Sequence, residues 1–143
     1  MQVQVVRDPR TAAYGFGDGH PFGTDRHDAF HAELAASGVA EQVRFTAART
    51  ATRAELCAFH TERYIDFVAA ACARGDALLD ERDTPAFPGL FEAASAVAGA
   101  TLNVLAAIMD GQARRGFVPI GGLHHAGRDH AAGFCVFNDC GIS

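Results

Sequence analysis

The sequence predicts a single α/β domain in which helices flank a parallel sheet. Three short apolar segments, at residues 2–6, 43–47 and 117–120, have the composition of strands, and helical patterns lie between them. Strands that alternate with helices form parallel sheets, because each helix returns the chain to the same end of the sheet. The chain has 143 residues, of which 49% are hydrophobic and 20% are charged, so it can bury a core without disulfides and is not a disordered polypeptide.

The first half of the chain begins with the predicted strand at residues 2–6. A glycine-rich loop with the sequence YGFGDGHPFGT follows at residues 14–24, and its length makes it a candidate binding loop. Thr24 is expected to cap a helix over residues 25–37, and Gly38 is expected to end that helix in the left-handed conformation.

The second predicted strand, residues 43–47, leads into two helices. The T-x-x-E pattern from Thr52 to Glu55 predicts a capping box at the start of a short helix. A longer helix is expected from Thr61 to Arg74. Its apolar residues have the spacing of one buried stripe and are Tyr64, Phe67, Val68, Ala71 and Cys72.

The second half of the chain is expected to contain a buried helix and the last strand. Residues 76–89 are acidic and contain prolines, which favours a surface loop. Residues 90–112 are apolar on nearly every helical face, which predicts a buried helix. No uninterrupted apolar run reaches the ~18 residues of a membrane span, so we expect no membrane partner. Asn138 and Asp139 have the residue types that begin helices, and the given sequence ends four residues later, at Ser143. We therefore expect the α/β fold to be incomplete at the carboxyl end.

Composition excludes some classes of function. The 12 basic residues form no basic run and the net charge is −5, which argues against a nucleic-acid partner held by phosphate contacts. The amino terminus lacks the pattern of a secretory signal. The cysteines form no C-x-x-C pair, so we expect reduced thiols and a cytoplasmic location; they are Cys57, Cys72, Cys135 and Cys140.

The residues that can carry chemistry follow the strand at 117–120. His124 and His125 are adjacent and lie near glycines, at the carboxyl end of a strand where ligands of parallel sheets bind. Two imidazoles can divide acid and base work, because one stays neutral while the other holds a proton. A solvated histidine pair is the alternative. A metal site made of His124, His125 and His130 is less well supported, because these residues lack the i, i+4 spacing of a zinc helix.

The stretch GGLHHAGRDHAAGFCVFND resembles the tandem-histidine motif of the zinc-dependent histone deacetylase superfamily. It is most similar to the bacterial acetoin-utilisation deacetylases and their acetylpolyamine amidohydrolase relatives. YGFGDGHPFGTDR, AELCAFHTERYIDFV and DTPAFPGLFEAASAVAGATLNVL resemble further family segments in the same order. The resemblance implies that residues 1–143 are the amino-terminal part of a single α/β domain of the arginase and deacetylase type, incomplete at its carboxyl end.

The resemblance also implies roles for individual residues. His125 matches the family's general base, and His124 matches its electrostatic and proton-donating partner. Gly133 and Phe134 match the residues that wall the channel for the acyl-lysine stem. Leu123 stands where many eukaryotic members have tryptophan, which implies a differently shaped inner pocket.

Two more matched residues have plainer alternatives. Asp83 matches the aspartate at the channel rim that accepts hydrogen bonds from the substrate backbone, and a solvated loop carboxylate is the alternative. Arg26 matches an arginine near the internal channel associated with acetate, and an arginine on a helix surface is the alternative.

The resemblance implies a zinc-dependent amidohydrolase that removes acetyl groups from acetyl-lysine or acetylpolyamine. The family's zinc ligands lie in a D-x-H strand and beyond, none of which is in this sequence. We therefore expect no metal to be bound by this chain alone, and we expect the 143 residues to be inactive alone. A short non-catalytic binding module, either an oligomer or a half-domain completed by another chain, is the alternative.

Overall fold

The computed structural model describes residues 3–17, 19–75 and 77–143. It confirms an α/β fold on a parallel sheet. Strands β1 (Val3–Val6), β2 (Val43–Thr46) and β3 (Gly116–Phe117) lie in the order β2-β1-β3, and β1 is parallel to both neighbours. Three residues of predicted segments lie outside the described residues; they are Gln2, Asp18 and Asp76.

Seven helices connect or follow the strands in the described part of the chain. They are α1 (Pro9–Ala12), α2 (Arg26–Ala36), the 3-10 helix η1 (Val39–Gln42), α3 (Arg53–Leu56), α4 (Glu62–Arg74), α5 (Leu90–Met109) and α6 (Asp139–Ile142).

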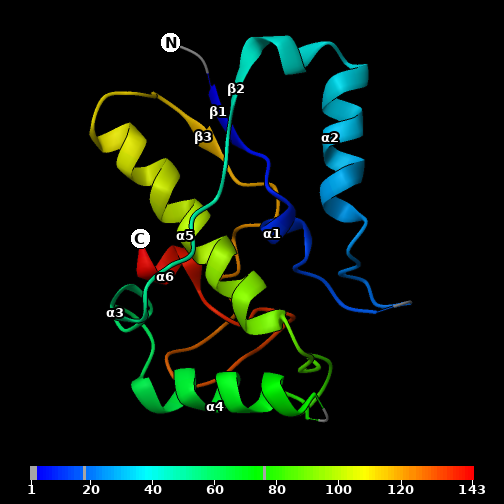
Figure 1. Ribbon diagram of the computed structural model, residues 1–143, viewed down its shortest axis with the longest axis vertical. Helices are drawn as coiled ribbons and strands as arrows, with labels where there is room; N and C mark the ends of the chain where they lie inside the picture. The colour runs from blue at the N-terminus through cyan, green and yellow to red at the C-terminus, as the bar shows by residue number, and fades with distance from the viewer. Residues whose placement is uncertain (1–2, 18, 76) are drawn as a thin grey trace.

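The sheet separates two helical layers. The register pairs Val5 with both Phe45 and Phe117, so these three side chains lie in one row on one face. Phe30 of α2 contacts Phe117 on this face, with 5.2 Å between ring centroids. On the other face Val6 packs in a cluster with residues of α5. Figure 1 shows α2 and α5 on opposite sides of the strands.

The local signals at helix ends are mostly confirmed. The capping box at Thr52 and Glu55 is present. Thr61 caps α4, and Gly75 ends it with φ at 71°. Gly38 has φ at 73° after α2. The Thr24 prediction is wrong, since Asp25 occupies the N-cap position and makes no side-chain cap hydrogen bond.

Three predicted segments differ in the structure. The predicted buried stripe of α4 includes Phe67, but this side chain is 43% exposed. Ile65, which lies outside the predicted stripe, is buried instead, so the buried face of α4 is shifted around the helix from the predicted one. The third strand is confined to residues 116–117, because Val118 begins a turn in which its carbonyl accepts a hydrogen bond from Gly121. Helix α5 ends at Met109 rather than at residue 112.

Helix α5 is the central helix of the core. Within the described residues it is the one helix whose length and composition would allow it to cross a membrane. In the folded protein, 56% of the most apolar 18-residue stretch of α5 is buried, and a buried core helix passes the same test of length and composition. Gly99 in this helix allows the segment at residues 49–51 to approach closely, and Ala51 N donates a hydrogen bond to Ser95 O.

Replacing Gly99 with alanine is expected to destabilise the protein by about 1–3 kcal/mol. Alanine favours helices over glycine by about 1 kcal/mol, but a Cβ here would overlap the Arg49 carbonyl oxygen and lie 2.6 Å from Ala51 N. Urea unfolding measures the change. As a control, Ala106→Gly on the exposed face of α5 is expected to cost about 1 kcal/mol through propensity alone. A Gly99→Ala variant as stable as the original would contradict this packing.

Candidate active site

The paired histidines lie in an irregular segment between β3 and α6. His124 and His125 are both exposed, whereas the flanking Leu123 and Ala126 are buried. The two imidazole rings are stacked, with centroids 4.4 Å apart and planes inclined by 34°. His124 Nδ1 lies 2.9 Å from the carbonyl oxygen of Gly122. A carbonyl can only accept, so this nitrogen carries the proton, and in the neutral ring Nε2 has the free lone pair.

A buried carboxylate anchors the start of this loop. Asp139 is 1% exposed. Its oxygens accept hydrogen bonds from Gly122 N at 3.0 Å, Leu123 N at 2.7 Å and the Thr101 hydroxyl at 2.6 Å. Because Thr101 belongs to α5, this carboxylate ties the backbone just before the histidines to the central helix.

The neighbouring Asn138 holds the backbone on both sides of His125. Its Nδ2 donates to the carbonyl of His124 at 3.2 Å and to the carbonyl of Ala126 at 2.8 Å. Its Oδ1 accepts from Gly141 N and so caps α6. One amide side chain thus brackets His125 and fixes the loop to the helix that follows.

A tight turn at residues 132–135 places Gly133 and Phe134 beside the pair. Both central residues have positive φ, at 53° and 68°, as in a type I′ turn. A Cβ on Gly133 would lie 3.2 Å from Cγ of His125, so the glycine lies against that ring. Phe134 is a non-glycine residue in this strained region, and such outliers occur at functional sites. Its ring lies 4.4 Å from the His20 ring, centroid to centroid.

Side chains satisfy the backbone of residues 134–138, which no strand pairs. Such groups must find partners when buried. The Tyr14 hydroxyl donates to Phe134 O at 2.6 Å and accepts from Val136 N at 3.1 Å, and the Tyr64 hydroxyl donates to Val136 O at 2.8 Å. Burial raises the pKa of both tyrosines, so both hydroxyls stay protonated.

His60 completes this support as a neutral ring. Its Nε2 accepts a hydrogen bond from Asn138 N at 2.9 Å, so Nδ1 carries the proton and faces Arg128 O at 3.3 Å. The ring is 2% exposed, and burial lowers its pKa.

The free energy of unfolding is therefore expected to fall as the pH decreases below about 6.5, where histidine in the unfolded chain takes up a proton. Folded His60 resists protonation, so the unfolded state binds more protons in this range and is favoured. Urea unfolding at several pH values measures the decline. His60→Gln keeps one donor and one acceptor, and it should flatten the curve. An unchanged pH dependence in His60→Gln would contradict this assignment.

The predicted rim residue Asp83 lies in an exposed loop. The Asp80 carboxylate organises this loop by accepting hydrogen bonds from three successive backbone nitrogens, those of residues 82–84. His20 Nε2 lies 2.9 Å from the carbonyl oxygen of Asp83, and Thr84 Oγ1 accepts from Phe134 N at 3.2 Å. The loop is thus attached to both His20 and Phe134.

Arg26 is exposed on α2, and its guanidinium lies over the Phe22 ring at 4.6 Å. Phe22 contacts Tyr14, with ring centroids 5.6 Å apart. The structure thus brings His124, His125 and Gly133 together directly. His20 contacts both the Phe134 ring and the Asp83 carbonyl and so connects these two residues. Arg26 contacts the Phe22 ring instead.

The described residues contain no group of three or more histidine, cysteine, aspartate or glutamate side chains that could hold a metal ion. Among the described residues, His124, His125 and His130 do not form such a group, and His130 Nδ1 lies 2.8 Å from Oδ1 of Asp129. The residues present therefore do not fit a three-ligand zinc site.

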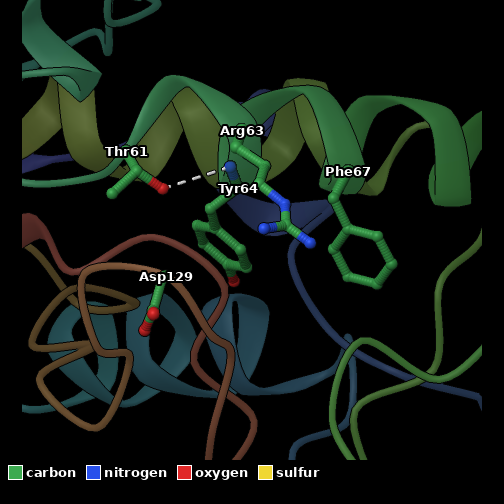
Figure 2. A pocket seen from close by; sticks show the side chains of 5 residues that line it. All are labelled: Thr61, Arg63, Tyr64, Phe67 and Asp129. Carbon is green, nitrogen blue, oxygen red and sulfur yellow. Dashed lines mark hydrogen bonds between the residues drawn. The ribbon is translucent and has the colours of Figure 1, made fainter.

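Two hollows lie near this region. A hollow of about 400 Å³ is lined by residues 16–17, 19–20 and 23–25, and among these Phe16 and His20 both contact Phe134. A hollow of about 500 Å³ lies between α4 and the loop that carries Asp129. Figure 2 shows Arg63 of α4 between Tyr64 and Phe67, with Asp129 on the opposite wall. The paired histidines do not line this second hollow.

Sequence reasoning missed the residues that hold the site. Asn138 and Asp139 were predicted to start a helix and to belong to the motif that contains the histidines, but no role in holding the histidine loop was assigned to them. Tyr14, His60 and Thr84 lie in segments that resemble the family, but their roles were not predicted, because each acts on backbone that lies far away along the chain.

The chain is similar to known proteins in sequence and in fold. The sequence profile of the histone deacetylase domain matches residues 20–143. Histone deacetylase RPD3 of Saccharomyces cerevisiae is 31% identical over 96% of this chain and 34% of its own length. The acetoin utilization protein AcuC of Bacillus subtilis is 34% identical over 96% of this chain and 38% of its own length.

Histone deacetylase 8 of Xenopus tropicalis is 34% identical over 76% of this chain and 31% of its own length. The crystal structure of the HDA15 HD domain superposes with a TM-score of 0.88 at 29% identity, and covers 99% of this chain and 42% of that one. The chain thus spans about a third of the length of these protein relatives. On the sequence match and the shared fold, the chain belongs to the histone deacetylase family.

Proposed function

We propose that this chain is the amino-terminal part of a metal-dependent amidohydrolase that removes acetyl groups from acetyl-lysine or acetylpolyamine. The observation that carries the proposal is the exposed, stacked pair of imidazoles at His124 and His125, held by Asn138 and Asp139. Relatives named as histone deacetylases and as an acetoin utilization protein support deacetylation in general.

The geometry of the pair suits proton transfer. The two rings lie side by side, with centroids 4.4 Å apart, and both are exposed. One neutral ring can then accept a proton from water while the charged ring donates one to the leaving amine. We assign the base to His125 and the donor to His124. A metal, when bound, polarises the acyl carbonyl and activates water, and its ligands would come from residues outside this chain.

The surroundings of the pair suit an acylated amine on a methylene chain. Gly133 lies against the His125 ring with no side chain of its own, and Phe134 offers a flat apolar wall of the kind that methylene groups pack against. Asp83 on the attached loop would accept hydrogen bonds from the substrate at the rim. A cytoplasmic location belongs to this proposal, since the four cysteines are all free thiols.

The 143-residue chain alone is expected to release no acetate from an acetyl-lysine peptide, with or without added Zn²⁺. The reason is that the described residues supply no set of three metal ligands. A fluorogenic acetyl-lysine peptide measures this directly. Turnover by the isolated chain that a chelator abolishes would contradict the proposal that the ligands lie elsewhere.

A second candidate is a binding module that a partner chain completes. It is favoured by exposed apolar side chains on the outer strands, Phe45 of β2 and Phe117 of β3. Strands β2 and β3 are the outer strands of the three-stranded sheet. Open sheet edges and exposed apolar side chains both favour association with other chains. Sedimentation of the purified chain tests it, since a stable monomer at high concentration would argue against this candidate.

A further inference from the structure

Helix α2 carries a histidine pair that the proposed reaction does not use. His27 and His31 belong to the sequence HDAFH and lie one helical turn apart, so their side chains share one face. Their ring centroids are 4.5 Å apart. The i, i+4 spacing that is absent at residues 124–130 is thus present here, on a regular helix of 11 residues.

Both rings are buried with nitrogens that have no hydrogen-bond partner. His27 is 5% exposed and His31 is 7% exposed. His27 Nε2 and both ring nitrogens of His31 have no partner in good hydrogen-bond geometry, although the Val6 backbone lies near enough to act on the pKa of His31. Buried polar atoms without a partner cost free energy, so such atoms call for an explanation.

A carboxylate sets the tautomer of His27. Its Nδ1 lies 3.0 Å from Oδ1 of Asp28. A carboxylate only accepts, so Nδ1 carries the proton, and in the neutral ring the unpartnered Nε2 carries the lone pair. Histidines that bind metals through one ring nitrogen commonly donate the N–H of the other ring nitrogen to a carboxylate, as His27 does to Asp28.

The surroundings leave room for further ligands. A hollow of about 280 Å³ is lined by His31 and Asp28 and reaches Phe45 of β2, and His27 is not among the residues that line it. A water molecule occupies about 30 Å³ in the liquid, so waters could complete a coordination shell. Arg7 also lines this hollow and opposes a cation, whereas Asp28 favours one. Burial, followed by the neighbouring His27 and Arg7, lowers the pKa of His31 and keeps its ring neutral.

We propose that His27 and His31 form a two-imidazole site for a divalent transition metal that prefers nitrogen ligands, such as Zn²⁺, Ni²⁺ or Cu²⁺. Water fills the remaining positions, and Asp28 orients His27 from behind. The site lies on the sheet face opposite α5 (Figure 1).

Titration calorimetry of the metal-free chain with Zn²⁺ and with Ni²⁺ tests the site. We expect saturable binding of one ion. His27→Gln and His31→Gln should each weaken it by more than about tenfold, and Asp28→Asn by about tenfold. His130→Gln is the matched control, since that exposed histidine also pairs with a carboxylate, and it should leave the affinity unchanged. Absence of saturable binding, or full affinity in the His27→Gln/His31→Gln double variant, would overturn the proposal.

A second measurement needs no substitution. In the ¹⁵N spectrum of the imidazoles, Zn²⁺ should shift the Nε2 resonance of His27 together with a nitrogen of His31. Shifts confined to His124 and His125 would overturn the site. Neither experiment depends on deacetylation, so failure here leaves the proposed function intact.

Discussion

His125→Ala is expected to lower kcat of the complete enzyme by about 100-fold or more. The proposed role of this ring is to accept a proton from water, and alanine cannot do so. The ring is exposed and accepts no structural hydrogen bond in the described protein, so its loss should leave the fold and KM nearly unchanged. Steady-state hydrolysis of an acetyl-lysine peptide separates the two constants.

His130→Ala is the matched control for this experiment. His130 is exposed in the same loop and pairs only with the exposed carboxylate of Asp129. It should retain the original kcat. A His125→Ala enzyme that keeps the original rate would remove His125 as the base.

Asp139→Ala is expected to lower the free energy of unfolding of the chain by about 3 kcal/mol or more. The change leaves the buried backbone nitrogen of Leu123 and the partly buried nitrogen of Gly122 without their acceptor, and it also frees the Thr101 hydroxyl. Such a loss is a large part of the 5–15 kcal/mol that typically stabilises a domain. Urea unfolding followed by circular dichroism measures it.

Two further variants make the Asp139 result interpretable. Asp139→Asn keeps one acceptor oxygen and should be destabilised by less than Asp139→Ala. Asp129→Ala removes an exposed carboxylate of the same segment and should change stability by no more than about 0.5 kcal/mol. Equal, small effects at positions 129 and 139 would mean that Asp139 does not anchor the histidine loop.

Short-range features of this fold follow from the sequence. The capping box at Thr52 and the ends of α4 depend on residues within one turn of each other, so local patterns predict them. The third strand does not follow in the same way. Its apolar run continues to Ile120, but pairing with β1 ends at Phe117, because the chain turns at Val118, whose carbonyl accepts a hydrogen bond from Gly121 N.

In the candidate site, too, the residues of a local motif could be predicted from the sequence, whereas the long-range contacts that hold them could not. The motif around His124 and Gly133 identifies the chemistry, because consecutive residues carry it. The supports come from far along the chain, as Tyr14 bonds to Phe134 across 120 residues and Thr101 bonds to Asp139 across 38. No periodicity encodes such contacts, so the sequence could name the histidines but could not show what holds them.

The most direct test of the account is acetate release from an acetyl-lysine peptide or an acetylpolyamine by the complete polypeptide that carries this segment. We predict steady turnover that a chelator stops, that added Zn²⁺ restores, and that a His124→Ala/His125→Ala variant lacks. Turnover that survives the loss of both histidines, or a complete polypeptide that binds metal yet hydrolyses neither substrate, would contradict it.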